Sequence, residues 1–217
     1  MKKSYVVSLS LATLLATSTL FGNSVLAEES DSVSSLSKEQ QEDIKKGQEI
    51  FQNYDVGDTL SEEDIKFLQE NARTNNNTTE KGQMRAAATI NKVKVFGSAR
   101  TSDRNVEADV SGNINEDISL TGSNHLYGDI KGYTVKGNVS QVKVTFDYSG
   151  YGLNFENKFN LVSKWSQNTG WVKGKSANLH VSKRWSGLNP MWEYWPKGEF
   201  KHPKGTLNVD ADYMTNN

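Results

Sequence analysis

The chain of 217 residues carries 25 Lys and Arg against 26 Asp and Glu side chains and contains no cysteine. Disulfide staples, cysteine-ligated metal centres and thiol nucleophiles are therefore excluded, and stability must come from a hydrophobic core. The formal net charge of −1 hides an asymmetry, because residues 28–85 have 7 basic and 14 acidic side chains whereas residues 86–217 have 16 and 12. This imbalance predicts two parts with different surfaces.

Residues 1–27 have the pattern of a secretory signal peptide. Two lysines follow Met1, an apolar stretch runs from Tyr5 to Phe21, and the segment ends on the small residue Ala27. The apolar stretch is interrupted by Ser and Thr and is too short to span a bilayer comfortably. We therefore expect bacterial-type export, cleavage after Ala27, and a secreted, extracellular product.

The next segment, residues 28–73, predicts an acidic helical hairpin. Ser37 and Gln40 have the spacing of a capping box, in which each side chain binds a backbone N–H of the first turn, and Ser61 with Asp64 forms a looser one. A glycine between the two helices supplies the turn. The acidic residues around this turn do not have the ligand spacing of an EF-hand, so we expect a solvated acidic surface there and no metal site.

Residues 74–85 are polar, of low complexity and without periodicity, which predicts a linker that proteases can cut. An acidic helical segment tethered ahead of a more basic domain has the organisation of a propeptide. A permanent accessory subdomain explains the same composition, and the sequence leaves both interpretations open.

From residue 86 to residue 217 the hydrophobic period is two. Runs of alternating apolar and polar residues recur between turn signals such as Ser149-Gly150. Roughly eight to ten short strands predict a mainly β fold, an antiparallel β-sandwich or barrel, preceded by the short α-helical hairpin. Residues 111–138, which are poor in large apolar side chains, favour loops and edge strands; a membrane-inserting hairpin is the alternative.

Signatures of catalysis and metal binding are absent from the sequence. It has no Gly-x-Ser-x-Gly elbow, no His-Glu-x-x-His motif and no phosphate-binding glycine loop, and its three histidines do not have metal-ligand spacing. We therefore predict no catalytic residue, no metal and no cofactor. A hydrolase stays open as an alternative if folding brings together two of the carboxylates of Glu156, Glu193 and Glu199.

Aromatic and basic residues gather near the C-terminus, where all five tryptophans lie between residues 165 and 195. We expect Trp165 and Trp171 in the core, since the first continues a strand pattern and the second follows a turn. Prolines at positions 190 and 196 should interrupt strand pairing and leave the segment Arg184–Lys197 as an exposed loop. The predicted binding residues are Lys183, Arg184, Trp185, Trp192, Tyr194, Trp195 and Lys197.

Indole rings beside lysines suit an anionic polymer, a sugar face or a membrane interface. The sequence therefore predicts a secreted, non-enzymatic β-domain protein that binds an anionic cell-envelope polymer, glycan or membrane surface through this loop. A secreted membrane-active toxin, pore-forming or antimicrobial, with an acidic propeptide is the main alternative, and an unrecognised hydrolase is the second. Nucleic acid is not an expected partner, because the charge excess of the second part is small. The oligomeric state stays open.

Overall fold

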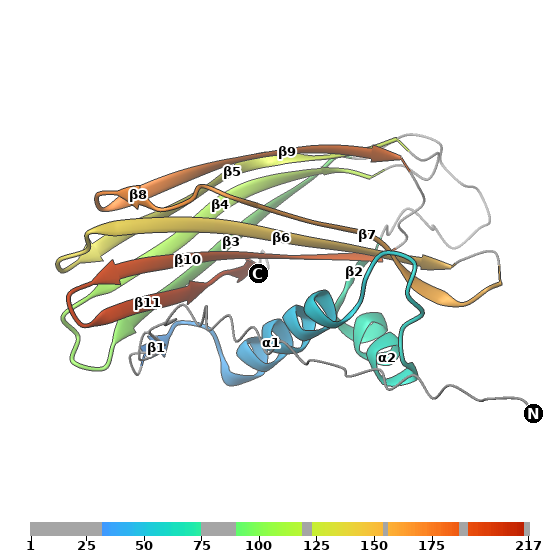
Figure 1. Cartoon of the computed structure of the whole chain (residues 1–217), viewed down its shortest axis with the longest axis horizontal. Coiled ribbons are helices and arrows are strands. Elements are labelled where there is room, and N and C mark those ends of the chain that lie inside the picture. Colours follow the sequence, from blue (N-terminus) through green and yellow to red (C-terminus); the bar gives the residue numbers. More distant parts are fainter. Residues whose placement is uncertain (1–31, 75–89, 119–122, 154–155, 187–190, 215–217) are drawn as a thin grey trace, which may run out of the picture.

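The computed structural model describes residues 32–74, 90–118, 123–153, 156–186 and 191–214 (Figure 1). Across these ranges the chain is mainly β, with two antiparallel sheets and two helices. The predicted fold class is confirmed to this extent, and so is a pair of helices ahead of the long strands. The predicted signal peptide and almost all of the predicted linker lie outside the described residues.

The two helices are α1 (Lys38–Asn53) and α2 (Glu62–Asn71). The predicted capping box of α1 is present: the Ser37 side chain accepts from the Gln40 backbone N–H at 3.1 Å, and the Gln40 side chain accepts from the Ser37 N–H at 3.0 Å. At the start of α2 only one half of such a box is present: the Ser61 side chain accepts from the backbone N–H of Asp64. These contacts fix both helix starts where the sequence places them.

The first sheet, sheet 1, has four long strands and two short edge segments. Both edge segments pair with β3, on the side away from β4. In spatial order the strands are β1 (Ser32–Ser34), β3 (Ile90–Thr101), β4 (Glu107–Asp117), β5 (Ser123–Lys136) and β9 (Ser176–Ser186), with β12 (Asp212–Tyr213) beside β3.

The second sheet, sheet 2, carries the aromatic C-terminal segment in an interior strand. Its spatial order is β11 (Gly205–Asp210), β10 (Met191–His202), β6 (Gln141–Leu153) and β7 (Phe159–Asn168), while β2 (Arg73–Thr74) pairs with β10 and β8 (Val172–Lys173) pairs with β6. Sheets 1 and 2 lie face to face along most of their length (Figure 1).

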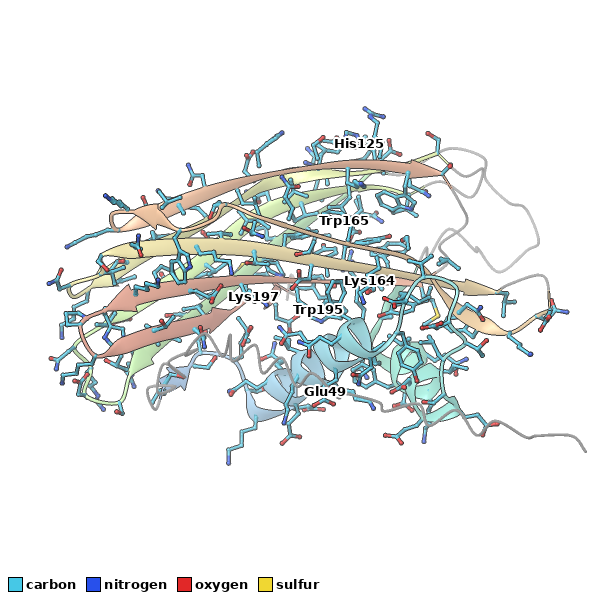
Figure 2. All side chains as sticks on the ribbon, viewed as in Figure 1. Glu49, His125, Lys164, Trp165, Trp195 and Lys197 are labelled. Carbon is cyan, nitrogen blue, oxygen red and sulfur yellow. The ribbon has the colours of Figure 1, made fainter. Side chains whose placement is uncertain are left out.

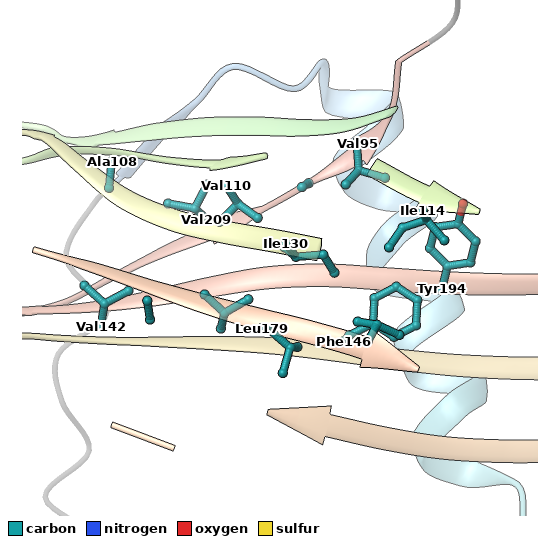
Figure 3. Close-up of a cluster of buried hydrophobic side chains, with 14 of the residues drawn as sticks. Val95, Ala108, Val110, Ile114, Ile130, Val142, Phe146, Leu179, Tyr194 and Val209 are labelled. Atoms are coloured by element: carbon teal, nitrogen blue, oxygen red, sulfur yellow. The ribbon is translucent and has the colours of Figure 1, made fainter. Parts of the chain in front are cut away.

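The main core lies between the two sheets (Figure 3). Sheet 1 contributes Val110 and Ile130, and sheet 2 contributes Phe146 and Tyr194. The prediction of loops and edge strands for residues 111–138 is wrong, because β4 and β5 are long interior strands whose inward side chains are fully buried. A side chain at Gly132 would collide with Val144 of sheet 2, and one at Gly128 would collide with the backbone of β4, so these positions have no room for a side chain.

The helical hairpin joins the two-sheet body through a second hydrophobic cluster. Ile50, Leu60 and Leu68 of the hairpin are buried against side chains of sheet 2, among them Leu161 and Met191. Full burial of one such side chain contributes about 1.5–3 kcal/mol. The hairpin is therefore packed as part of the fold, beneath sheet 2 in Figure 1.

Candidate functional site

Of the segment 184–197 that the sequence placed on an exposed loop, residues 184–186 end strand β9, residues 187–190 lie outside the described residues, and residues 191–197 belong to strand β10. Its described part, from Met191, pairs with β6 along nearly its whole length. Trp192 and Tyr194 point into the main core with 0% and 2% of their surface exposed, and Trp195 on the opposite face is 5% exposed. The predictions of a loop and of exposed anchors at these three residues are wrong.

Pro196 does not interrupt the pairing of β10 with β6, although proline lacks a backbone N–H. The carbonyl of Pro196 accepts a hydrogen bond from the backbone N–H of Ala211, which follows the end of β11. The nitrogen of Pro196 therefore also points towards the β11 side and away from β6. In an antiparallel strand the N–H and C=O of one residue point to the same neighbour, and here that neighbouring strand has already ended. The missing donor therefore costs no ladder hydrogen bond to β6.

Trp192 and Tyr194 hold a buried carboxylate that sequence reasoning missed. Glu116 of β4 is 0% exposed and accepts hydrogen bonds from the Trp192 indole N–H at 3.2 Å and from the Tyr194 hydroxyl at 2.9 Å. The guanidinium of Arg73 completes the set with two hydrogen bonds of 2.6 and 2.8 Å. This arrangement is structural: it pairs a buried charge and ties β2 to the body.

Trp195 lies on the face of sheet 2 that α1 covers, just above this helix in Figure 2, where its ring abuts Gly47 and meets Phe51 edge to face at 5.9 Å between ring centroids. The neighbouring Glu193 is also buried there, and its pKa is raised to about 8, chiefly by burial. The Tyr151 hydroxyl donates to the Glu193 carboxyl at 3.4 Å. The outer face of β10 at this point is therefore an internal contact with the hairpin.

The other predicted binding residues are separated by the fold. Lys183 and Arg184 are exposed on sheet 1, whereas Lys197 lies on the outer face of sheet 2, 3.5 Å from the carboxylate of Asp147. The Trp185 ring is half-buried and packs against Tyr148. The structure does not bring the predicted set together as one site.

Four tight turns between described strands lie together at one end of the body, at the left of Figure 1. The turns connect β3 to β4, β5 to β6, β8 to β9 and β10 to β11. Backbone hydrogen bonds hold neighbouring turns together: Ser140 donates to Lys201, and Gly174 donates to Ser140. The basic residues of this "basic end" are Arg104, Lys136, Lys173, Lys175, Lys201 and Lys204.

Few carboxylates neutralise the basic end. Lys204 pairs with Asp103 at 2.8 Å and, by this hydrogen bond, holds the pKa of that carboxyl well below its usual range. Within the described ranges, Lys173, Lys175 and Lys201 have no carboxylate partner. These ammonium groups are therefore available to an anion.

Trp171 is the aromatic residue of the basic end. It is 37% exposed, so the prediction of a core position is wrong, whereas Trp165 does pack against the core through Phe146 and Tyr148. The Lys201 ammonium lies 4.1 Å from the centroid of the Trp171 ring, and that of Lys143 lies 5.9 Å from it. The ring thus orients the Lys201 cation, whereas Lys143 is held by Glu199 at 2.7 Å.

The carboxylates considered for hydrolysis do not form a pair. Glu193 and Glu199 lie on the same face of β10, six residues apart, which corresponds to about 20 Å along a strand. Paired glycosidase carboxylates are about 5–9.5 Å apart. Glu199 is instead bound by Lys143 at 2.7 Å, and Glu156 lies 2.9 Å from Lys158.

No group of three or more His, Asp or Glu residues is arranged to hold a metal ion in the described ranges. In the same ranges, neither helix is long and apolar enough to cross a membrane. Comparison with protein-family models, with curated proteins and with solved structures gives no match to this chain.

Proposed function

We propose that this is a secreted, non-enzymatic protein with a β-sandwich body whose basic end binds an anionic polymer of the cell envelope. The observation that carries the proposal is the Trp171 ring with the Lys201 ammonium 4.1 Å from its centroid, since the Lys143 ammonium nearby is already paired with Glu199. A lysine already ordered on an aromatic face loses less side-chain entropy when an anion binds. The contact therefore favours binding of repeated negative charges.

The residues around Trp171 favour a ligand with several negative charges over a single small anion. Lys173 and Lys175 flank the turn into β9, and Lys204 lies on the turn that follows β10. Cations on separate turns match a ligand that presents several anionic groups in succession. Their attraction is long-ranged at low salt and is screened within about 8–10 Å at physiological ionic strength, so binding should weaken with added salt.

Co-sedimentation with an insoluble anionic wall polymer tests the proposal. Trp171→Ala and Lys201→Gln should each lower affinity about five- to tenfold, because each removes part of an ordered cationic contact. Lys66→Gln on α2 is the matched control, since it removes one exposed positive charge far from the basic end and should change affinity less than twofold. Equal losses in all three variants would contradict a localised site.

The membrane-active alternative has one supporting observation. Strands β4 and β5 have 11 and 14 residues and alternate buried with solvent-facing side chains, which is long enough for a β-hairpin to span a bilayer. Against it, Glu116 stands on the apolar face of β4 and would have to enter lipid. Dye release from anionic vesicles decides: leakage by the wild type at concentrations that saturate the polymer would favour the alternative.

A further inference from the structure

The outer face of sheet 1 carries a groove lined by both polar and apolar side chains. One hollow of about 520 Å³ is lined by side chains of β3, β4, β5 and β9, and a second of about 650 Å³ extends towards Arg73 and Tyr213. The two hollows share Lys94, Asn113 and Met214, so they form one continuous surface. We refer to it as the sheet 1 groove.

Strand register sets the spacing of functional groups along the groove. Asn113 lies between Lys94 and Asp129, and Ser111 lies between Phe96 and Lys131. Neighbouring strands are about 4.8 Å apart, and residues two apart on one strand are about 6.7 Å apart. Amides, ammonium groups and apolar side chains therefore alternate at intervals of the size of one sugar ring.

The charge of the groove is positive and largely uncompensated. Lys92 and Lys94 have no carboxylate partner within the described ranges, and the acidic residue of the lining, Asp129, is already 3.0 Å from His180. Lys131 lies over the Tyr133 ring, 5.6 Å from its centroid. An anionic ligand complements this charge.

The remaining side chains select the class of anion. Asn113 and Asn178 are exposed and offer both a donor and an acceptor, as adjacent sugar hydroxyls require, whereas phosphate alone would need only donors. Phe96 and Met214 add apolar surface for the face of a sugar ring. We infer that the sheet 1 groove is a second binding site, which takes an extended acidic glycan, a sugar chain bearing carboxylate or sulfate groups.

Binding of three probes to the full chain tests this inference: an oligogalacturonate, a neutral oligosaccharide of equal length, and inorganic polyphosphate. Lys94→Gln and Asn113→Ala should each weaken oligogalacturonate binding about tenfold, since each removes a polar contact to the bound chain. Polyphosphate binding should change less than twofold in Asn113→Ala. Trp171→Ala should show the opposite pattern, with polyphosphate binding reduced more strongly.

Lysine acetylation of the wild-type protein gives a readout that needs no variant. Bound oligogalacturonate should protect Lys92 and Lys94 from acetylation, and the neutral oligosaccharide should not. The proposed groove site would be refuted if bound oligogalacturonate left Lys92 and Lys94 unprotected. It would also be refuted if oligogalacturonate binding were unchanged in Lys94→Gln and Asn113→Ala. Loss of polyphosphate binding in Trp171→Ala would still support the basic end, so the two sites fail independently.

Discussion

Glu193 makes the stability of the fold depend on pH in a defined direction. The carboxyl is buried between sheet 2 and α1, and this burial raises its pKa from an ordinary value of 4.5 to about 8. Asp43 of the facing helix adds repulsion to the ionised form. The folded protein therefore holds a proton between about pH 4.5 and pH 8 that the unfolded chain has lost. Stability is largest below this window and falls as the pH rises through it.

The pKa difference sets the size of the effect. At about 1.4 kcal/mol for each pKa unit, it corresponds to at most about 5 kcal/mol of unfolding free energy lost between pH 4.5 and pH 8. Glu193→Gln keeps the side-chain shape and the contact with Tyr151 but cannot ionise. The variant should be close to the wild type at pH 5 and more stable than it by several kcal/mol at pH 9.

Urea unfolding followed by tryptophan fluorescence at pH 5, 6, 7, 8 and 9 measures this difference. Asp43 also has its pKa raised, by burial and by neighbouring carboxylates, so part of the pH dependence should remain in the variant. Glu199→Gln on the same strand is the matched control, because Glu199 is paired with Lys143 on the outer face. Parallel stability curves for the wild type and Glu193→Gln would refute the reasoning.

Three further predictions concern how the hairpin is held. Gly47→Ala should destabilise the protein by about 1–3 kcal/mol instead of giving the usual helical gain, since the added Cβ would lie 2.6 Å from the Trp195 ring; increased stability in thermal melts would contradict the contact. Arg73→Met should cost about 3–5 kcal/mol in urea unfolding by leaving Glu116 buried and unpaired, and adding Glu116→Gln should recover part of the loss; no recovery would show that the charge is not the cause. The fragment 86–217, predicted from the sequence as the β-domain, lacks Arg73 and the hairpin side chains, so we expect it to unfold at lower urea than the full chain; equal midpoints would show that the hairpin contributes nothing.

The elements that local rules determine could be predicted from the sequence. Both helix starts follow from side chains that bind the first free N–H groups, and alternation identified β3 and the first part of β6. The turn predicted at Ser149-Gly150 is wrong, because β6 continues through both residues with an irregularity in its pairing to β7 after Gly150. Strand β10 was missed because Trp192, Glu193, Tyr194 and Trp195 are all buried, so the segment shows no alternation. One face of this strand packs against sheet 1 and the other against α1. Because α1 lies well over a hundred residues earlier in the chain, no local sequence pattern indicates that it covers the strand.

The candidate sites could not be found from the sequence for a related reason. The basic end combines turns from four separate parts of the chain, each with one or two basic residues, and becomes a site only through the strand order. The sheet 1 groove depends on register, which places Lys94 beside Asn113 and Phe96 beside Ser111. The Trp-rich segment gave the stronger sequence signal, yet its rings mostly form the core and the contact with α1.

The charge layout relates the hairpin to the proposed binding sites. Residues 28–85 carry a net charge of −7 and residues 86–217 a net charge of +4, so the two parts together are acidic while the body alone is basic. The hairpin packs on sheet 2 away from these four turns (Figure 1), and its described part, residues 32–74, carries 10 acidic and 5 basic side chains. An approaching polyanion is therefore repelled by one region and attracted by the other, and this steers it towards the turns. If the predicted linker is cut and the hairpin leaves, the repulsion is lost and Trp195 is uncovered, so polyanion affinity at low salt should rise together with the tendency to aggregate.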